Sequence, residues 1–208
     1  MNIKILNTLL FLSHILLFSS ILPAFALEGN ASDGKVKSTT CMACHGPTGN
    51  SVVPMWPSIA GQHANYLEEA LLSYKDGSRE DPVMSPQTLN LSDQDIADLA
   101  TYYEGQTITL HSADKELVSS GERIYRGGNK ENNTSACIAC HGPKGRGNKP
   151  ARYPSLTGQF AVYTAQQLEK YKNGVRKTDG DKKIMRMIAS TLTDQEIKAV
   201  ASYIQGLR

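Results

Sequence analysis

The sequence holds few cysteines, and this scarcity limits the chemistry that the chain can carry. Only four occur among 208 residues, and all four lie in two copies of one short motif. A disulfide scaffold would spread its cysteines around the fold, so none is left for that purpose. Alternating runs of Val, Ile and Thr are also scarce, which argues against a β-sheet protein. Beyond the N-terminal segment, no stretch is apolar enough to span a bilayer.

The motif that uses all the cysteines is Cys-x-x-Cys-His, at residues 41–45 and again at 137–141. This is the attachment signature of c-type haem, in which two thiols bond one porphyrin and the histidine binds the iron. A redox pair or half of a zinc site also uses Cys-x-x-Cys. However, the halves of a four-cysteine zinc site usually lie about 12–20 residues apart, and each copy here has its own histidine. We therefore expect two covalently bound haem c groups. The expected attachment residues are Cys41, Cys44, Cys137 and Cys140, with His45 and His141 as iron ligands.

Residues 1–26 have the layout of a secretory signal peptide. Lys4 precedes an apolar stretch over 9–18, and the run Ala24-Phe25-Ala26 supplies a cleavage site. The segment has no twin-arginine pair, which favours the general secretory route. An uncleaved membrane anchor is the competing interpretation of the same stretch. A cleaved signal predicts an exported protein in the bacterial periplasm.

An internal repeat extends well beyond the two haem motifs. Its period is close to 100 residues, which is too long for a solenoid, where units are about 20–50 residues. The repeat instead predicts two domains of one fold. We expect an N-terminal domain at 27–106, a linker at 107–113 and a C-terminal domain at 114–208. The matching segments are Trp56–Gln62 with Tyr153–Gln159, Tyr74–Arg79 with Tyr171–Arg176, and Leu91–Ile96 with Leu192–Ile197.

The apolar periodicity between the motifs is helical. Leu67, Ala70, Leu71 and Tyr74 are spaced as the buried stripe of a helix, and 96–103 and 197–204 repeat this spacing. The segments that begin at Ser92 and Thr193 each carry an acidic residue three positions later, the pattern of a capping box. The expected fold class is therefore all-α, with each domain wrapped around its haem.

A haem that transfers electrons has a second axial ligand, and methionine with histidine raises its reduction potential. Met84 and Met185 each lie seven residues before a matching leucine of the repeat, Leu91 and Leu192. Met187 is the rival in the second domain. The register predicts His45 and Met84 as ligands of the first iron, and His141 and Met185 as ligands of the second.

Residues around the ligands also match between the halves. A backbone carbonyl at Pro57 or Pro154 is placed to accept the second ring N–H of the preceding ligand histidine. Arg79 and Arg176 occupy equivalent positions. Two interpretations of these arginines stay open, namely pairing with haem propionates and lying at a solvated helix end.

The net charge of +2 conceals a strong asymmetry. Residues 27–105 carry 4 basic and 11 acidic side chains, whereas residues 106–208 carry 17 basic and 9 acidic ones. Such a dipole can orient the molecule during encounter with redox partners. Alternatively, the opposite charges help the two domains to dock. Nucleic acid is not an expected partner, because the basic residues lie on a haem domain of an exported protein.

Taken together, the two Cys-x-x-Cys-His-Gly domains and the repeated Gly-Gln and Tyr-Lys-x-Gly-x-Arg segments resemble the dihaem cytochromes c4. The likeness covers essentially the whole mature chain. It implies two class I cytochrome c domains that face each other about a pseudo-twofold axis, with His/Met ligation at both irons. It also implies a periplasmic electron carrier that works toward a terminal oxidase.

We therefore expect an electron-transfer protein with no catalytic residues, rather than an enzyme. Its expected partners are an electron donor such as a membrane cytochrome complex and an acceptor such as a terminal oxidase. Peripheral association with the membrane is compatible with this role. The alternative is a dihaem peroxidase or the cytochrome subunit of a dehydrogenase. A peroxidase needs one iron with an open or displaceable sixth site, which a methionine in register in both halves disfavours.

Overall fold

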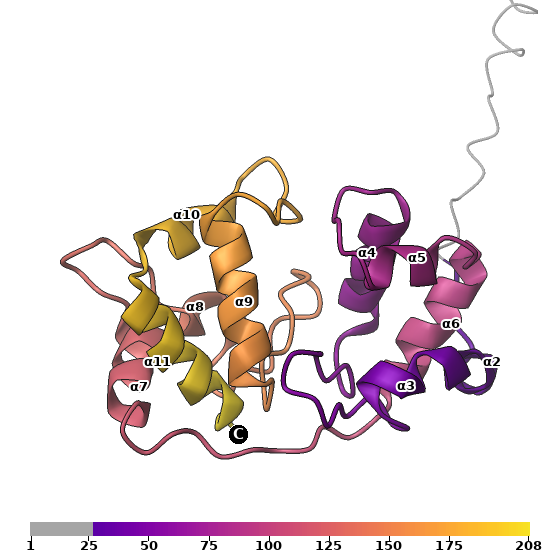
Figure 1. Ribbon diagram of the computed structural model, residues 1–208, viewed down its shortest axis with the longest axis horizontal. Coiled ribbons are helices and arrows are strands. Elements are labelled where there is room, and N and C mark those ends of the chain that lie inside the picture. Colours follow the sequence, from indigo (N-terminus) through magenta and orange to yellow (C-terminus); the bar gives the residue numbers. More distant parts are fainter. Residues whose placement is uncertain (1–26) are drawn as a thin grey trace, which may run out of the picture.

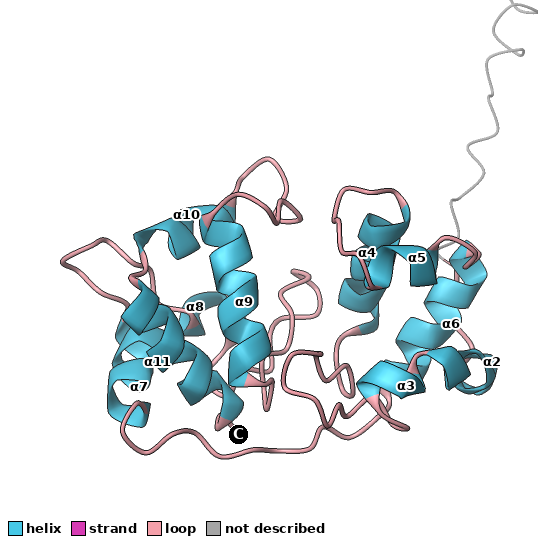
Figure 2. Ribbon diagram, viewed as in Figure 1, coloured by secondary structure: helices cyan, strands magenta, loops and turns pink. Residues whose placement is uncertain are grey.

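The computed structural model describes residues 27–208, and the expected signal peptide at 1–26 lies outside the described residues. Across residues 27–208 the regular structure is helical, with two isolated β-bridges and no strand (Figure 2). The expected all-α fold is confirmed. No helix between residues 27 and 208 combines the length and the apolar character needed to cross a membrane.

The helices form two groups that lie side by side and are joined by an extended segment between α6 and α7 (Figure 1). The first group is α2 (Ala31–Lys37), η1 (Ser38–Thr40), α3 (Met42–His45), α4 (Ala64–Lys75), α5 (Met84–Thr88) and α6 (Asp93–Glu104). The second group is α7 (Val118–Gly127), α8 (Ile138–His141), α9 (Ala161–Lys172), α10 (Ile184–Thr191) and α11 (Asp194–Gln205).

The last helix of each group begins where the sequence predicts. Ser92 accepts a hydrogen bond from the Asp95 backbone N–H, and the Asp95 side chain accepts one from the Ser92 backbone. Thr193 and Glu196 make the same reciprocal pair at the start of α11. Both capping boxes satisfy N–H groups that would otherwise lack a partner at a helix start. Both predicted caps are confirmed.

In each group the first helix crosses the last one at a glycine. A β-carbon on Gly34 of α2 would collide with the backbone carbonyl of Asp98 in α6. A β-carbon on Gly121 of α7 would collide in the same way with the carbonyl of Ala199 in α11. Because glycine has no side chain, the two helix backbones approach closely enough to close each domain.

Each domain has its own hydrophobic core. The first core includes Leu67, Leu99 and Tyr103, and Cys41 packs against it. The second is built around Tyr125 and helix α11, and Cys137 packs against it. The first cysteine of each motif therefore lies at the edge of the apolar interior, where a large apolar group would add to a small core.

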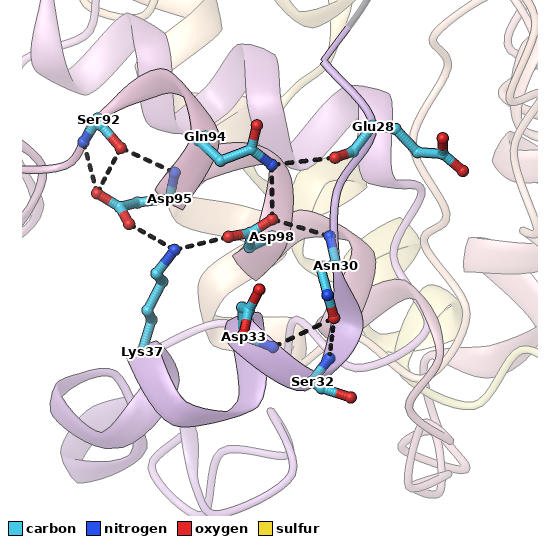
Figure 3. Close-up of polar contacts among 9 residues, drawn as sticks. All are labelled: Glu28, Asn30, Ser32, Asp33, Lys37, Ser92, Gln94, Asp95 and Asp98. Atoms are coloured by element: carbon cyan, nitrogen blue, oxygen red, sulfur yellow. Dashed lines mark hydrogen bonds and ion pairs between the residues drawn. The ribbon is translucent and has the colours of Figure 1, made fainter.

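A polar cluster ties the start of the first domain to α6 (Figure 3). The Asp98 side chain is only 2% exposed and accepts hydrogen bonds from the Asn30 backbone, the Gln94 amide and the Lys37 ammonium. Lys37 also pairs with Asp95 at 2.7 Å. The Asn30 N–H and the Lys37 ammonium hold the pKa of Asp98 below its usual range. The second domain has Ala199 at the position equivalent to Asp98, so this cluster is particular to the first domain.

The extended segment between the domains is held against the first one. Asn50 donates to the Thr107 carbonyl at 2.9 Å and accepts from the Thr109 N–H at 2.6 Å. These bonds fix the segment's backbone in two places, and thereby limit how freely the second domain moves relative to the first.

The domains meet through two glutamines that occupy equivalent positions of the repeat. The Gln62 side chain donates to the Ser155 carbonyl and accepts from the Ser155 N–H, both at 2.9 Å. The Gln159 side chain makes the same pair of bonds with Ser58, at 2.8 and 3.0 Å. Each domain therefore makes the same side-chain hydrogen bonds to the backbone of the other, which is the pattern of a pseudo-twofold interface.

Opposite charges reinforce this interface. In residues 27–208, each ion pair between the domains joins a cation of the second domain to a carboxylate of the first. This arrangement supports the interpretation that the charge asymmetry helps the domains to dock. The pairs are Lys149–Glu104 at 2.7 Å, Arg152–Glu69 at 3.4 Å and Lys170–Asp81 at 3.4 Å.

Candidate haem sites

Both histidines of the repeated motif are buried and oriented by a backbone carbonyl. The Nδ1 atom of His45 lies 2.8 Å from the Pro57 oxygen, and Nδ1 of His141 lies 3.0 Å from the Pro154 oxygen. A carbonyl can only accept, so Nδ1 carries the proton and Nε2 keeps its lone pair. Burial lowers the pKa of both histidines, which favours the neutral, metal-binding form. The predicted role of the two proline carbonyls is confirmed.

The first cysteine of each motif is in a poor environment for a thiolate. Burial raises the pKa of the Cys41 thiol, and it raises the pKa of the Cys137 thiol to about 11. Both thiols are therefore protonated at neutral pH, unlike those of redox-active or zinc-binding cysteines. A thioether to a porphyrin is neutral, so this apolar environment suits it. None of the four cysteines forms a disulfide within residues 27–208.

The two methionines of the repeat lie at corresponding places near the start of a short helix. Met84 is half-buried and begins α5, where the Asp81 carboxylate accepts from the backbone N–H groups of Val83 and Met84. Met185 is half-buried in α10, whereas Met187 in the same helix is 57% exposed. Met185, which the register predicts as the ligand, is thus the more buried of the two methionines.

Arg79 and Arg176 lie in the interior, not at a solvated helix end. They are 7% and 6% exposed, and each guanidinium lies over a tyrosine ring of its own domain. Neither arginine makes an ion pair with a carboxylate of residues 27–208. A buried charge without a counter-ion is costly. The acidic propionates of a haem are groups of the sign and size that these cations require, so the residues present fit the cofactor.

The remaining histidines of the described chain have structural partners. His63 lies 2.8 Å from the Arg146 carbonyl oxygen across the domain interface. His111 stacks on Phe160, with ring centroids 4.5 Å apart.

Sequence reasoning did not assign a role to the residues that join the two sites. Gln62 and Gln159 end a repeated segment, and that repetition was the available signal. Tyr66 and Tyr163 also occupy equivalent positions, and their hydroxyls accept from Arg176 and Arg79 of the opposite domain. Their contacts depend on how the two domains face each other, which no local pattern reports.

Comparisons with known proteins agree with this arrangement. The Cytochrome c family pattern matches residues 31–105 and 119–208. The chain is 45% identical over 188 residues to cytochrome c4 of Azotobacter vinelandii, covering 86% of this chain and 90% of that protein. It is 31% identical over 195 residues to the thiosulfate dehydrogenase electron acceptor of Stutzerimonas stutzeri, covering 88% and 89%. The crystal structure of reduced recombinant cytochrome c4 from Pseudomonas stutzeri superposes with a TM-score of 0.85 at 42% identity, covering 86% of this chain and all of that one.

The fold and the two sites therefore define a c-type cytochrome built of two tandem cytochrome c domains. Such a protein carries two covalently bound haem c groups and transfers electrons to and from redox protein partners. More narrowly, the chain belongs to the cytochrome c4 family.

Proposed function

We propose that this protein is a periplasmic electron carrier that works between respiratory partners and delivers electrons toward a terminal oxidase, without substrate chemistry of its own. The observation that carries the proposal is the equivalence of the two sites. Each has a buried histidine with a free Nε2 and a half-buried methionine in register. A site closed on both sides of the iron suits electron transfer, whereas a peroxidase needs an open one.

In this proposal each residue has a defined task. Cys41 and Cys44 attach the first haem, and Cys137 and Cys140 attach the second. His45 with Met84 would bind the first iron, and His141 with Met185 would bind the second. The haem irons supply one-electron chemistry by cycling between the ferric and ferrous states.

The protein's contribution is to keep the ligands in place through that cycle. The Pro57 and Pro154 carbonyls fix the imidazole tautomers, and such hydrogen bonds also raise the basicity of a ligand histidine. Asp81 fixes the backbone at Met84. A ligand set that is held rigidly changes little in geometry between oxidation states, which keeps electron transfer fast.

The proposal includes the placement and division of the chain. Residues 1–26 are a cleavable secretory signal, 27–106 and 114–208 are the two haem domains, and 107–113 link them. The A-x-A sequence before Leu27 supports export. The maturation of c-type haem after export is consistent with a periplasmic location.

A pair of methionine variants tests the ligand assignment. The matched substitutions are Met185→Ala and Met187→Ala, in the same helix and two residues apart. Met185→Ala should convert the second haem to a high-spin form and remove its methionine–iron absorption, while Met187→Ala leaves the spectrum unchanged. The reverse pair of results would mean that Met187 is the ligand. A high-spin haem in the unaltered protein would contradict the carrier proposal and support the peroxidase alternative.

A second candidate donor comes from the similarity to thiosulfate dehydrogenase electron acceptors. In that case the electrons come from a thiosulfate dehydrogenase instead of a membrane cytochrome complex. Stopped-flow reduction of the oxidised protein by each donor type distinguishes the two, because only the physiological donor gives a fast, salt-dependent bimolecular rate.

A further inference from the structure

The side chain of Gln167 in α9 contacts the buried arginines of both domains with a single atom. Its Oε1 accepts from Nη2 of Arg79 at 2.8 Å and from Nη1 of Arg176 at 3.0 Å. Both hydrogen bonds are buried, and Gln167 itself is buried. One amide oxygen therefore joins the equivalent arginines of the two halves.

The tyrosine contacts of these arginines follow the pseudo-twofold symmetry, whereas the 3.1 Å bond from Arg176 Nε to the Thr178 hydroxyl has no counterpart at Arg79. Arg79 donates to the Tyr163 hydroxyl at 3.3 Å, and Arg176 donates to the Tyr66 hydroxyl at 2.9 Å. The Arg79 guanidinium lies 4.5 Å from the ring centroid of Tyr74, and that of Arg176 lies 4.6 Å from the ring centroid of Tyr171. The tyrosine contacts thus treat the two domains alike.

Gln167 breaks this symmetry. The equivalent residue of the first domain is Ala70 in α4, which has no polar side-chain atom. The oxygen between the two arginines therefore comes from the second domain alone. This departure from the repeat lies at the centre of the cluster, where one atom contacts both arginines, and it indicates a role that the repeat itself does not supply.

The electrostatics of the cluster give that oxygen its effect. Both arginines are always protonated, and their bonded nitrogens lie at most ~6 Å apart because they share one acceptor. In a buried environment two like charges at that separation repel strongly and raise the local potential. The amide oxygen places the negative end of a dipole between them, which offsets part of that positive potential and fixes where both guanidiniums lie.

We propose that Gln167 is a positioning residue that sets the reduction potentials of both haems together, by holding the two arginines that neutralise haem propionates on either side of the domain interface. The inference rests on the proposed function, in that both sites must hold haem. Positive charge near a haem favours the reduced state, so the net charge of the shared cluster acts on both irons. A residue in the second domain thereby tunes the first domain's haem as well as its own.

Spectroscopic redox titration of the full two-haem protein tests the proposal. Gln167→Leu keeps the side-chain volume and removes the oxygen, so both midpoint potentials should rise. Gln167→Glu places a full negative charge at the same point, so both should fall. The matched controls are Gln166→Leu and Gln166→Glu, because Gln166 is the neighbouring residue of the same helix and makes no side-chain hydrogen bond to residues 27–208. Neither control should shift the potentials by a comparable amount.

A rise of both midpoint potentials in Gln167→Leu, together with a fall of both in Gln167→Glu, supports the proposal. A shift of the second haem alone, or equal shifts in the Gln166 controls, overturns it. If Gln167→Leu loses thermal stability but leaves both potentials unchanged, the residue is structural only and the proposal is wrong. Failure of the proposed function is visible independently, since the unaltered protein would then lack two low-spin haems.

Discussion

Replacing Gln62 by alanine would remove two of the hydrogen bonds that join the domains. The lost bonds are those to the backbone N–H and carbonyl of Ser155, both at 2.9 Å. The net contribution of a typical protein hydrogen bond is about 0.5–1.5 kcal/mol, so the docking of the domains should weaken by about 1–3 kcal/mol. Gln159→Ala removes the equivalent pair of bonds to Ser58 and should weaken docking by a similar amount.

Differential scanning calorimetry of the oxidised protein can measure this loss. When the first domain unfolds, the contacts between the domains are lost, so the second domain then unfolds without any stabilisation from the interface. Both variants should therefore lower the first transition, by about 10 °C for about 2 kcal/mol in a domain of this size, although they lie in different domains. The second transition should move much less, because the interface is lost by then and each glutamine has only one other bond, from the backbone N–H of the next residue, His63 or Phe160.

The matched control is Gln195→Ala, which removes an exposed glutamine of α11 that makes no side-chain hydrogen bond to residues 27–208. It should leave both transitions in place. If each interface variant instead lowered only the transition of its own domain, the glutamines would be intradomain elements and the reasoning would be refuted.

Two further predictions concern the single domains. Gly121→Ala should destabilise the second domain by about 1–3 kcal/mol, because its methyl group meets the Ala199 carbonyl, whereas Gly127→Ala in the same helix meets nothing and should be tolerated; thermal unfolding of both variants checks this. The depressed pKa of Asp98 means that its stabilisation is present above its ordinary pKa of about 4 and is lost as the pH falls through the lower folded value. Asp98→Asn should therefore be less stable than the unaltered protein at neutral pH, by a margin that narrows in acid, and a constant margin in urea unfolding across that range would contradict this.

The structure favours one of the two roles that the sequence allows for the charge asymmetry between the domains. The sequence allowed it to serve either partner encounter or domain docking. Lys149, Arg152 and Lys170 pair with carboxylates of the first domain, so part of the charge asymmetry is neutralised within the molecule. Each of these pairs is partly exposed, so each contributes little alone, and their common direction matters more than their number.

Local spacing in the sequence was sufficient to predict the haem-attachment motifs and the starts of the last helices. Two thiols and a histidine within five residues form one site wherever that segment lies in the fold, so Cys41–His45 and 137–141 needed no tertiary information. The capping boxes at Ser92 and Thr193 are equally local, because the partner residue is only three positions away. The repeat then indicated two copies of one domain.

Tertiary structure alone decided which residues join those copies. Gln62 meets Ser155 at a separation of 93 residues, and Arg79 meets Gln167 at a separation of 88. Such contacts depend on how one folded domain is placed against the other, and no periodicity within either domain encodes that placement. For the same reason, the sequence left the surroundings of Arg79 and Arg176 open, because part of what contacts these buried side chains comes from the opposite domain.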